Sequence, residues 1–255
     1  MPVMVRLMAQ PMVMPIPTIT TMITGLTMTT ITPTIMTDNI ALIRLMTWLS
    51  PAFPVGGFNY SHGLEQAVAD GLVHDRTSLQ VWLEALLGAG SAWNDLVLLA
   101  QAWRLATAGE DLSEIADLAE ALAGSRERHL ETINQGTAFL LAATVWDVAP
   151  PTGLGKTVAL PVAVGALSGA SGLPLETTLG AFLLAFVTNQ LQVAQRLLPI
   201  GQSGAVAVQS NLEALIAKTA MRAENSGLDD LGSMTFNAEI AALKHETLAT
   251  RIFVT

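Results

Sequence analysis

The sequence predicts an all-α protein, a single-domain bundle of roughly eight to ten helices. Apolar residues recur every three to four positions after residue 38, which is the spacing of a helix that buries one face. Short alternating runs of β-branched residues bounded by turns, the signature of strands, are scarce in the same range. The 255 residues are enough for one sizeable core, and with no cysteine neither a disulfide framework nor a thiolate metal site can support it.

Residues 1–37 differ in composition from the rest. They are a mixture of Met, Thr, Pro and Ile in which Arg6 is the only charged residue. Prolines at positions 11, 15 and 17 interrupt the continuous apolar stretch that a secretory signal needs. We therefore expect 1–37 to be a disordered or mis-annotated N-terminal extension, with Met36–Asp38 a plausible beginning, and 38–255 to be the all-helical domain.

The first clear helix carries an apolar stripe formed by Leu79, Trp82, Leu83, Leu86 and Leu87. Further along, Asp111-Leu-Ser-Glu114 resembles a capping box that would start a helix, and Gly124 stands where a left-handed C-cap residue is expected. Ser125 can cap the next helix, which we expect from Arg126 to about Thr144.

A loop is predicted from Asp147 to Gly155, because two prolines and two glycines rule out a continuous helix there. An apolar helix is expected over 159–170, where Gly165 and Gly169 would let two helix backbones approach closely. Pro174 fits the first turn of a long helix that ends before Pro199. Two more helices are expected near 203–223 and 237–250, the last capped by Asn237.

The overall composition narrows the classes of function. The chain has a formal net charge of −9 and no stripe of basic residues, which argues against a nucleic-acid-binding protein. Apolar residues make up 51% and charged residues 13%, so much apolar surface must be covered. The densest apolar stretch, 179–187, is shorter than the ~20 residues of a membrane-spanning helix. We therefore expect a soluble protein whose apolar faces meet partners.

No segment predicts catalysis convincingly. Gly153–Thr157 resembles part of a phosphate-binding loop, but Pro150 stands where that loop requires its first glycine, and no strand precedes it. Four histidines (His62, His74, His129 and His245) lack the spacing of a metal site and are expected to be polar surface or interface groups. No serine lies on a recognisable nucleophile elbow. We expect no catalytic, cofactor-binding or metal-binding residue, and no enzyme.

Two stretches stand out. Residues 48–65 hold two prolines, two adjacent glycines and four aromatics between 48 and 60, a costly and specific bend. Residues 227–246 form a polar turn that leads into a terminal helix, and the sequence then ends in apolar residues. Each also has a plain structural interpretation, as a helix-connecting corner and a packed terminal helix. An apolar end suggests docking, on the chain's own body or on a partner.

These stretches resemble the UreF family of urease accessory proteins. LSPAFPVGGFNYSHGLE (49–65) is similar to the family signature, and residues 230–246 resemble its C-terminal pattern. Ser125-Arg-Glu127 with Glu131 and Gly136, residues 161–165 (PVAVG) and residues 196–202 (RLLPIGQ) resemble three further motifs in the same order. The chain departs from the family pattern with His62 in place of Glu, Phe236 in place of Pro and Lys244 in place of Arg.

The resemblance implies an all-α, non-catalytic scaffold for nickel insertion into urease. Such a protein would dimerise, bind UreD (also called UreH), recruit the GTPase UreG and meet the urease apoprotein in the cytoplasm. Nickel and GTP would be handled by the partners. The expected partner-binding residues are Phe58, Tyr60, Glu65, Arg196, Gln202, Asp230, Phe236, His245, Glu246, Arg251 and Phe253.

Within that set, the segment from Leu228 to Phe253 is expected to dock onto UreD, with Phe236 and Phe253 as apolar anchors and Glu246 and Arg251 setting the register. The alternatives are a nickel-binding metallochaperone that uses His62, His74 or His245, and a generic helical interaction protein.

Overall fold

A computed structural model describes residues 32–255, with side chains from residue 39 onward. Within this range the chain is all-α and has no strand, as predicted. The elements are α1 (Thr32–Trp48), the 3-10 helix η1 (Gly57–Asn59), α2 (Leu64–Ala69), α3 (Arg76–Ala89), α4 (Ser91–Ala108), α5 (Ser113–Ala121), α6 (Arg126–Ala143), α7 (Leu160–Ala170), α8 (Leu175–Leu197), α9 (Gly201–Glu224), the 3-10 helix η2 (Leu228–Asp230) and α10 (Phe236–His245).

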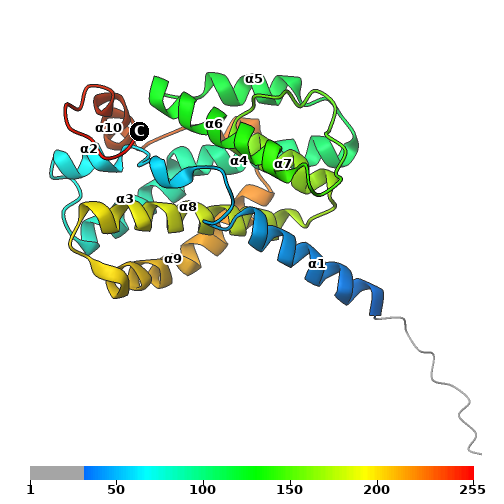
Figure 1. Cartoon of the computed structure of the whole chain (residues 1–255), viewed down its shortest axis with the longest axis horizontal. Coiled ribbons are helices and arrows are strands. Elements are labelled where there is room, and N and C mark those ends of the chain that lie inside the picture. The colour runs from blue at the N-terminus through cyan, green and yellow to red at the C-terminus, as the bar shows by residue number, and fades with distance from the viewer. Residues whose placement is uncertain (1–31) are drawn as a thin grey trace, which may run out of the picture.

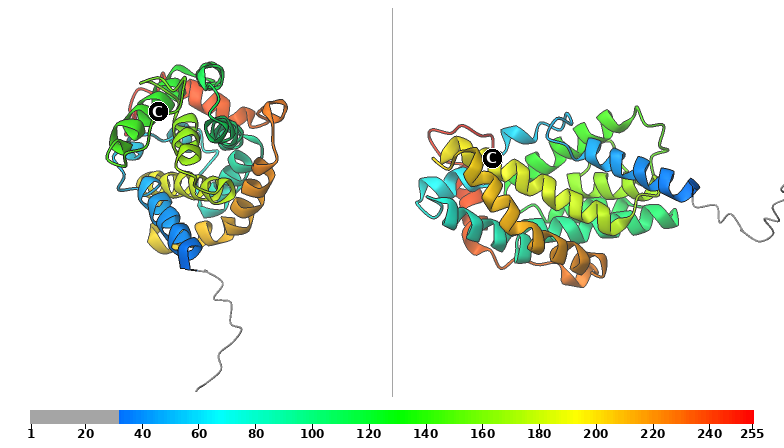
Figure 2. Two further views of the ribbon diagram at one scale, coloured as in Figure 1. Left: turned by 90° about the vertical axis from the view of Figure 1, so that its right-hand side faces the viewer. Right: turned by 90° about the horizontal axis from the view of Figure 1, so that it is seen from below.

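Helix α4 forms the centre of the bundle. It packs against α7, α3, α8 and α9, while α5 and α6 cover the side of α7 (Figure 1). Helix α1 runs along the outside and extends away from the body, as the two further views also show (Figure 2). Helices α2 and α10 pack together at the end of the molecule that carries the C-terminus (Figure 1).

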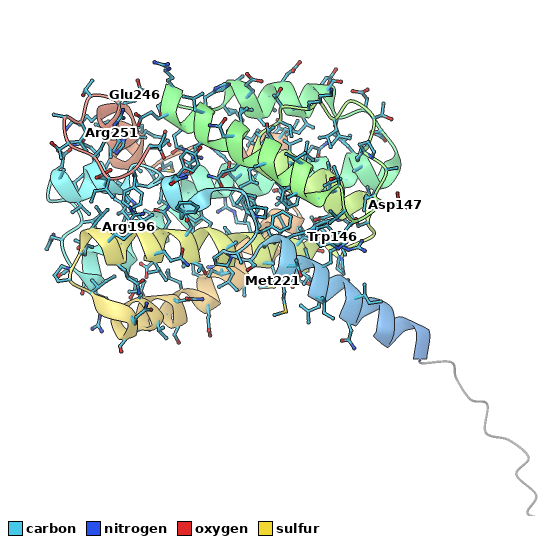
Figure 3. All side chains as sticks on the ribbon, in the orientation of Figure 1. Trp146, Asp147, Arg196, Met221, Glu246 and Arg251 are labelled. Atoms are coloured by element: carbon cyan, nitrogen blue, oxygen red, sulfur yellow. The ribbon has the colours of Figure 1, made fainter. Side chains whose placement is uncertain are left out.

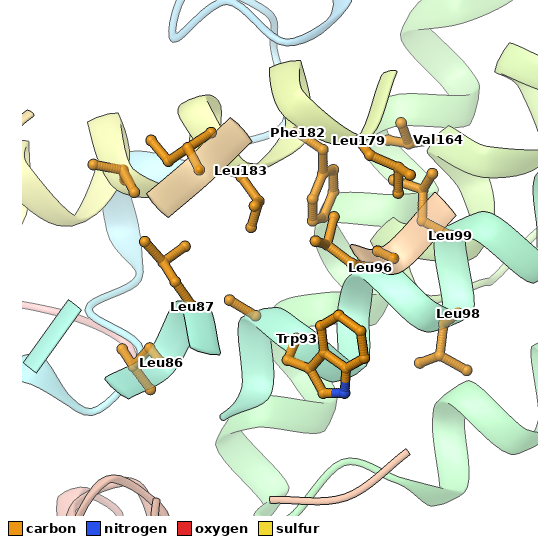
Figure 4. Close-up of a cluster of buried hydrophobic side chains, with 14 of the residues drawn as sticks. Leu86, Leu87, Trp93, Leu96, Leu98, Leu99, Val164, Leu179, Phe182 and Leu183 are labelled. Carbon is orange, nitrogen blue, oxygen red and sulfur yellow. The ribbon is translucent and has the colours of Figure 1, made fainter. Parts of the chain in front are cut away.

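The core is built from leucine and aromatic side chains at helical spacing. The predicted stripe on α3 is buried, and it meets the apolar faces of α4 and α8 (Figure 4). Leu87, Leu96, Leu99, Leu179 and Leu183 are essentially inaccessible to solvent. Burial of this kind stabilises the fold by about 25 cal/mol for each Å² of apolar surface removed from water.

The predicted close approach of two helices at Gly165 and Gly169 is confirmed. Both glycines lie on α7 against the backbone of α4. A Cβ on Gly165 would be 2.3 Å from the carbonyl oxygen of Leu99, and one on Gly169 would be 2.5 Å from that of Trp103. Only glycine permits this contact distance between the two helices.

The helix ends agree only partly with the prediction. Ser125 caps α6 by accepting a hydrogen bond from the amide of Arg128 at 3.1 Å, as predicted. The expected left-handed cap at Gly124 is wrong, because α5 already ends at Ala121 and Gly124 has no positive φ. Its missing side chain instead leaves room for the carboxylate of Glu239, which a Cβ would approach to 2.8 Å.

Two other helix starts differ as well. Asp111 accepts a hydrogen bond from the amide of Ser113, but Leu112 is the N-cap residue and the predicted box with Glu114 does not form. The last helix begins at Phe236 rather than being capped by Asn237, because hydrogen bonds tie the turn before it to Ala89 on α3 and to Asn94 on α4. The amide of Met234 donates to the carbonyl oxygen of Ala89, which sets where the helix can start.

The N-terminal prediction concerns residues 1–37, of which 1–31 lie outside the described part. Residues 32–37 belong to α1. Whether the first 37 residues form an extension separate from the domain stays a prediction.

Within the described residues, α8 is long and apolar enough to cross a membrane by length and composition. Half of its most apolar window is buried inside the protein, and it packs against α9 and α4. This is the position of a core helix.

Candidate functional site

The corner between α1 and α2 is shaped by three left-handed residues. Gly56, His62 and Gly63 have φ values of 72°, 56° and 78°. Gly63 is required for a second reason, since a Cβ there would lie 3.1 Å from the backbone nitrogen of Ala242 on α10. The corner therefore brings α2 directly against α10, although they are far apart in the sequence.

Glu65, on α2, is buried at this junction. Its carboxylate accepts hydrogen bonds from the amides of Ile252 at 2.7 Å and Phe253 at 3.0 Å. It also lies 3.0 Å from Nε2 of His245. One side chain thus binds both α10 and the residues after it, which we name the C-terminal strap (residues 247–255).

His245 connects this carboxylate to α6. The ring is fully buried, and its Nδ1 lies 2.7 Å from Oε2 of Glu127. Glu127 in turn pairs with Arg251 on the strap. The buried imidazole is thus flanked by two carboxylates, and Glu127 also faces a guanidinium, so each buried polar group of the junction has a partner.

A second polar cluster lies beside the first. Arg128 pairs with Glu131 at 2.6 Å and lies 4.0 Å from Asp95, while Nδ1 of His62 lies 3.5 Å from Glu131. Burial raises the pKa of Asp95 to about 6, with Arg128 opposing and Glu131 adding to this effect. Burial would also raise the pKa of Glu131, but Arg128 and His62 outweigh it and lower that pKa to about 2.

Burial, assisted by Arg128, lowers the pKa of His62. Nε2 of the neutral ring forms a hydrogen bond with the hydroxyl of Ser91.

The strap completes the junction. Ser61 donates hydrogen bonds from its amide and its hydroxyl to the carbonyl oxygen of Thr255, whose own hydroxyl donates to Glu131 at 3.0 Å. The guanidinium of Arg196 stacks on the ring of Phe253, 4.2 Å from its centroid. The strap therefore docks on the chain's own body, one of the two possibilities left open by its apolar composition.

The outer surface of this end is apolar. Met234, Phe236, Ile240 and Leu243 are 78%, 72%, 49% and 51% exposed, and we name them the apolar face. Phe236, Ile240 and Leu243 are spaced four and three apart on α10, so they point to the same side of the helix. A groove of about 620 Å³ runs beside it, between α3 and the start of α10.

The predicted partner-binding residues divide into two groups. Seven are exposed: Phe58, Arg196, Gln202, Asp230, Phe236, Glu246 and Arg251. Figure 3 shows Arg196, Glu246 and Arg251 at the end of the molecule near α10. Four are buried: Tyr60, Glu65, His245 and Phe253.

Burial corrects two expectations. Phe253 is 3% exposed and packs inside the chain, so in this conformation it cannot serve as an apolar anchor for a partner. His62 and His245 are not surface groups, because carboxylates and hydroxyls of the fold surround their rings. His74 and His129 do lie at the surface, where His129 pairs with Glu120.

Several exposed residues have structural contacts of their own. Glu246 accepts a hydrogen bond from the amide of Arg126 at the start of α6. The backbone of Asp230 accepts from the indole of Trp93, while Gln202 accepts from Gln195. Asp230 and Gln202 thus make their contacts away from the strap.

Sequence reasoning missed the groups that complete the junction, namely Ser61, Asp95, Arg128 and Thr255, and it placed no site role on Glu127 or Glu131. The spacing of Glu127 and Glu131, four apart on one helix, was the one local signal. Among the residues that the structure describes, no group of three or more His, Asp or Glu side chains could hold a metal ion.

A family model described as UreF matches residues 73–213. The urease accessory protein UreF of Brucella ovis is 56% identical over 226 residues, which cover 89% of this chain and 99% of that protein. The urease accessory protein UreF of Mesorhizobium japonicum is 54% identical over 221 residues, 86% of this chain and 99% of that protein.

Proposed function

We infer the role of this chain from one premise: it belongs to the UreF family of urease accessory proteins, and it therefore takes part in urease maturation. We propose that it does so as a scaffold with no reaction of its own, which presents a shaped apolar surface to other maturation proteins.

The apolar face on α10 is the observation that carries this proposal. Contiguous exposed apolar side chains on a folded protein mark interaction surfaces, because leaving them in water is unfavourable. Phe236 is a large aromatic anchor of the kind that dominates binding energy at interfaces. The adjoining groove beside α3 supplies a concave partner surface.

The buried network beneath the apolar face supports the same role. Glu65, His245 and Glu127 hold α10 and the strap in one position relative to α6. A surface that is already ordered loses little conformational entropy on binding, so more of the contact energy becomes affinity.

In this proposal UreD docks onto the apolar face and the neighbouring strap. The assembly then recruits UreG, which brings nickel and GTP, and meets the urease apoprotein in the cytoplasm. The chain itself binds neither cofactor and forms a homodimer within the complex. Of the exposed predicted residues, Phe58 and Arg196 at the corner, together with Gln202, would face the dimer partner or UreG.

A pull-down with UreD tests the docking surface. The double substitution Phe236→Ser and Ile240→Ser removes two exposed apolar side chains without touching the buried junction. We expect UreD binding to weaken by about ten-fold or more, since central aromatic anchors contribute about 2 kcal/mol or more. Sizing of the wild-type complex would measure the number of copies in it.

The matched control is the double substitution Val206→Ser and Met221→Ser on α9, where both side chains are also exposed. It removes similar apolar surface from another helix, so UreD binding should be unchanged. Equal loss in both variants, or undiminished binding in the α10 variant, would contradict the proposed surface.

A further inference from the structure

A cavity of about 120 Å³ lies beneath the corner, between α6 and α8, and no residue of the apolar face lines it. A water molecule needs roughly 10–15 Å³ of such space, so the cavity has room for a molecule of several heavy atoms. Its walls include Trp48, Gly57, Asp95, Gln135 and Gln190.

One end of the cavity is rich in hydrogen-bond acceptors. Nε2 of Gln135 donates to the carboxylate of Glu131 and Nδ2 of Asn189 donates to the carbonyl oxygen of Tyr60, both at 3.4 Å. Since those two partners can only accept, the orientation of each amide is settled, and its oxygen points elsewhere. Both amide oxygens converge near Gly57, at 3.7 and 3.6 Å from the place a Cβ there would occupy.

The side-chain oxygen of Gln190 is a further acceptor in the cavity, and no donor from the described residues is bonded to it. Its side chain is 1% exposed, and its Oε1 has no hydrogen-bond partner among the described residues. A buried polar atom left unpaired is unfavourable, so a donor from a bound molecule would be favourable here.

The charge of the cavity is negative at neutral pH. Asp95 and Glu131 contribute two carboxylates, while Arg128 contributes one guanidinium, which lies closer to Glu131 than to Asp95. His62 is held neutral by burial, which lowers its pKa. One carboxylate charge is therefore left to be balanced.

The other end of the cavity is aromatic. On α6, the polar residues Glu131 and Gln135 come before Phe139, which lies eight residues after Glu131. On α8 the order is reversed, and Phe182 lies eight residues before Gln190. Eight residues of helix span roughly 12 Å, so polar and apolar groups occupy separate ends. Trp48 lies edge-on to Phe139, with ring centroids 5.6 Å apart.

We propose that this cavity binds a small organic cation whose head carries N–H groups, an alkylammonium or alkylguanidinium. The head lies between Asp95 and the three amide oxygens, and the aliphatic body lies among Trp48, Phe139 and Phe182. This ligand site is independent of the docking surface proposed above.

The chemistry favours this class over others. An anion would meet the excess carboxylate charge that Asp95 and Glu131 share opposite the single guanidinium of Arg128, and a neutral apolar molecule would leave the amide oxygens unpaired. A metal ion would need several ionisable ligands, and the described residues hold no such cluster. An N–H-bearing cation satisfies both the charge and the acceptors.

Titration of the full-length protein with n-butylammonium chloride, followed by calorimetry and by NMR of the side-chain amides, tests the proposal. Two related compounds distinguish the contribution of the positive charge from that of hydrogen-bond donation. Trimethylbutylammonium keeps the charge and the body but has no N–H group, and n-butanol keeps the body without the charge. We expect n-butylammonium to bind at least ten-fold more tightly than either, and to shift the amide signals of Gln135, Asn189 and Gln190.

Two variants locate the site. Asp95→Asn removes the charge, and Gly57→Ala places a methyl group beside the two amide oxygens at ordinary contact distances of 3.6 and 3.7 Å, which the fold tolerates. Each should weaken n-butylammonium binding at least ten-fold. Gly180→Ala, in open space on α8, should leave binding unchanged.

Four results would overturn the proposal. Absence of saturable binding would mean that the cavity holds water only. Equal affinity for the three compounds would show that neither charge nor N–H donation is recognised. Unmoved amide signals, or unchanged affinity in Gly57→Ala, would place the binding elsewhere.

Discussion

At the scale of single residues, Glu65 links three parts of the chain. Its carboxylate accepts from the amides of Ile252 and Phe253 and faces His245, all within 3.0 Å. Each of the two carboxylate oxygens accepts a hydrogen bond from a backbone amide. A glutamine at this position would replace one of these acceptors by an NH₂ group, which can only donate.

We therefore predict that Glu65→Gln destabilises the protein by about 1–3 kcal/mol, because the amide NH₂ would oppose a donor and leave it unpaired in the interior. Urea unfolding measures the loss, and hydrogen exchange at Ile252 and Phe253 should quicken. Glu213→Gln, an exposed change on α9, is the control and should change the free energy of unfolding by less than about 0.5 kcal/mol. Equal effects in the two variants would contradict the structural role of Glu65.

Asp95 is a second residue whose environment makes a measurable prediction. Burial raises its pKa to about 6, above the ordinary value near 3.9 for an unfolded chain. The folded protein therefore favours the protonated form. Its free energy of unfolding falls as the pH rises from about 4 to 6, and the loss persists above that range.

Asp95→Asn should thus stabilise the protein at pH 8 by about 1–3 kcal/mol, with the gain shrinking as the pH falls from 6 towards 4. Urea unfolding at several pH values measures this dependence. A gain that does not depend on pH would mean that the charge of Asp95 is not its source. The same change is expected to weaken binding in the cavity, so stability and ligand binding would move in opposite directions.

At the scale of elements, the contact of α4 with α7 depends on glycine. The predicted spacing of Gly165 and Gly169 is confirmed as a close backbone approach. This feature could be predicted because small residues four apart on one helix are a local signal, whereas the partner helix could not be identified from the sequence.

Gly165→Val should destabilise the protein by several kcal/mol, about 3 or more, since its side chain would overlap the carbonyl of Leu99 and force the helices apart. Gly180→Ala, in a helix interior with no atom within 4 Å of the new Cβ, should instead stabilise by about 0.5–1 kcal/mol. Thermal unfolding of both variants measures whether Gly165→Val lowers the stability and Gly180→Ala raises it. A mild effect at Gly165 would show that α7 can shift without cost.

Helix ends were harder to predict than helix bodies. The stripe on α3 and the body of α6 were predicted correctly, because periodicity over many residues reports a buried face. Gly124 and Asn237 were assigned caps that the structure does not use. At those positions contacts from distant residues, such as Glu239 beside Gly124, outweighed the local preference.

At the scale of the whole molecule, the metallochaperone alternative remains open to a direct measurement. We predict that equilibrium dialysis of the chain alone will show no saturable nickel site. Within the described residues His62, His74 and His245 are separately placed, and the two buried ones are hydrogen-bonded to carboxylates. Substitution of His74 by Ala is the control, since this exposed histidine is the most accessible candidate. Stoichiometric nickel binding that His62→Ala, His74→Ala or His245→Ala abolishes would favour the metallochaperone.

The buried junction shows how much of the candidate site could be predicted. The two stretches that contain it, 48–65 and 227–246, were identified from composition and from their resemblance to one family. The pairing of Glu65 with His245 across 180 residues was not predicted, and neither was the burial of Phe253. No local pattern specifies which distant side chains will meet.

The sequence alone determined that the protein is helical, where most helices lie, and which family it belongs to, because apolar spacing and ordered motifs are properties of the chain itself. Only the tertiary structure decided that the strap folds back on the corner, that two histidines are buried, and that a cavity rich in acceptors lies beneath it. These features arise from contacts between segments far apart in the sequence, and the energy of such contacts depends on distances that exist only once the chain has folded.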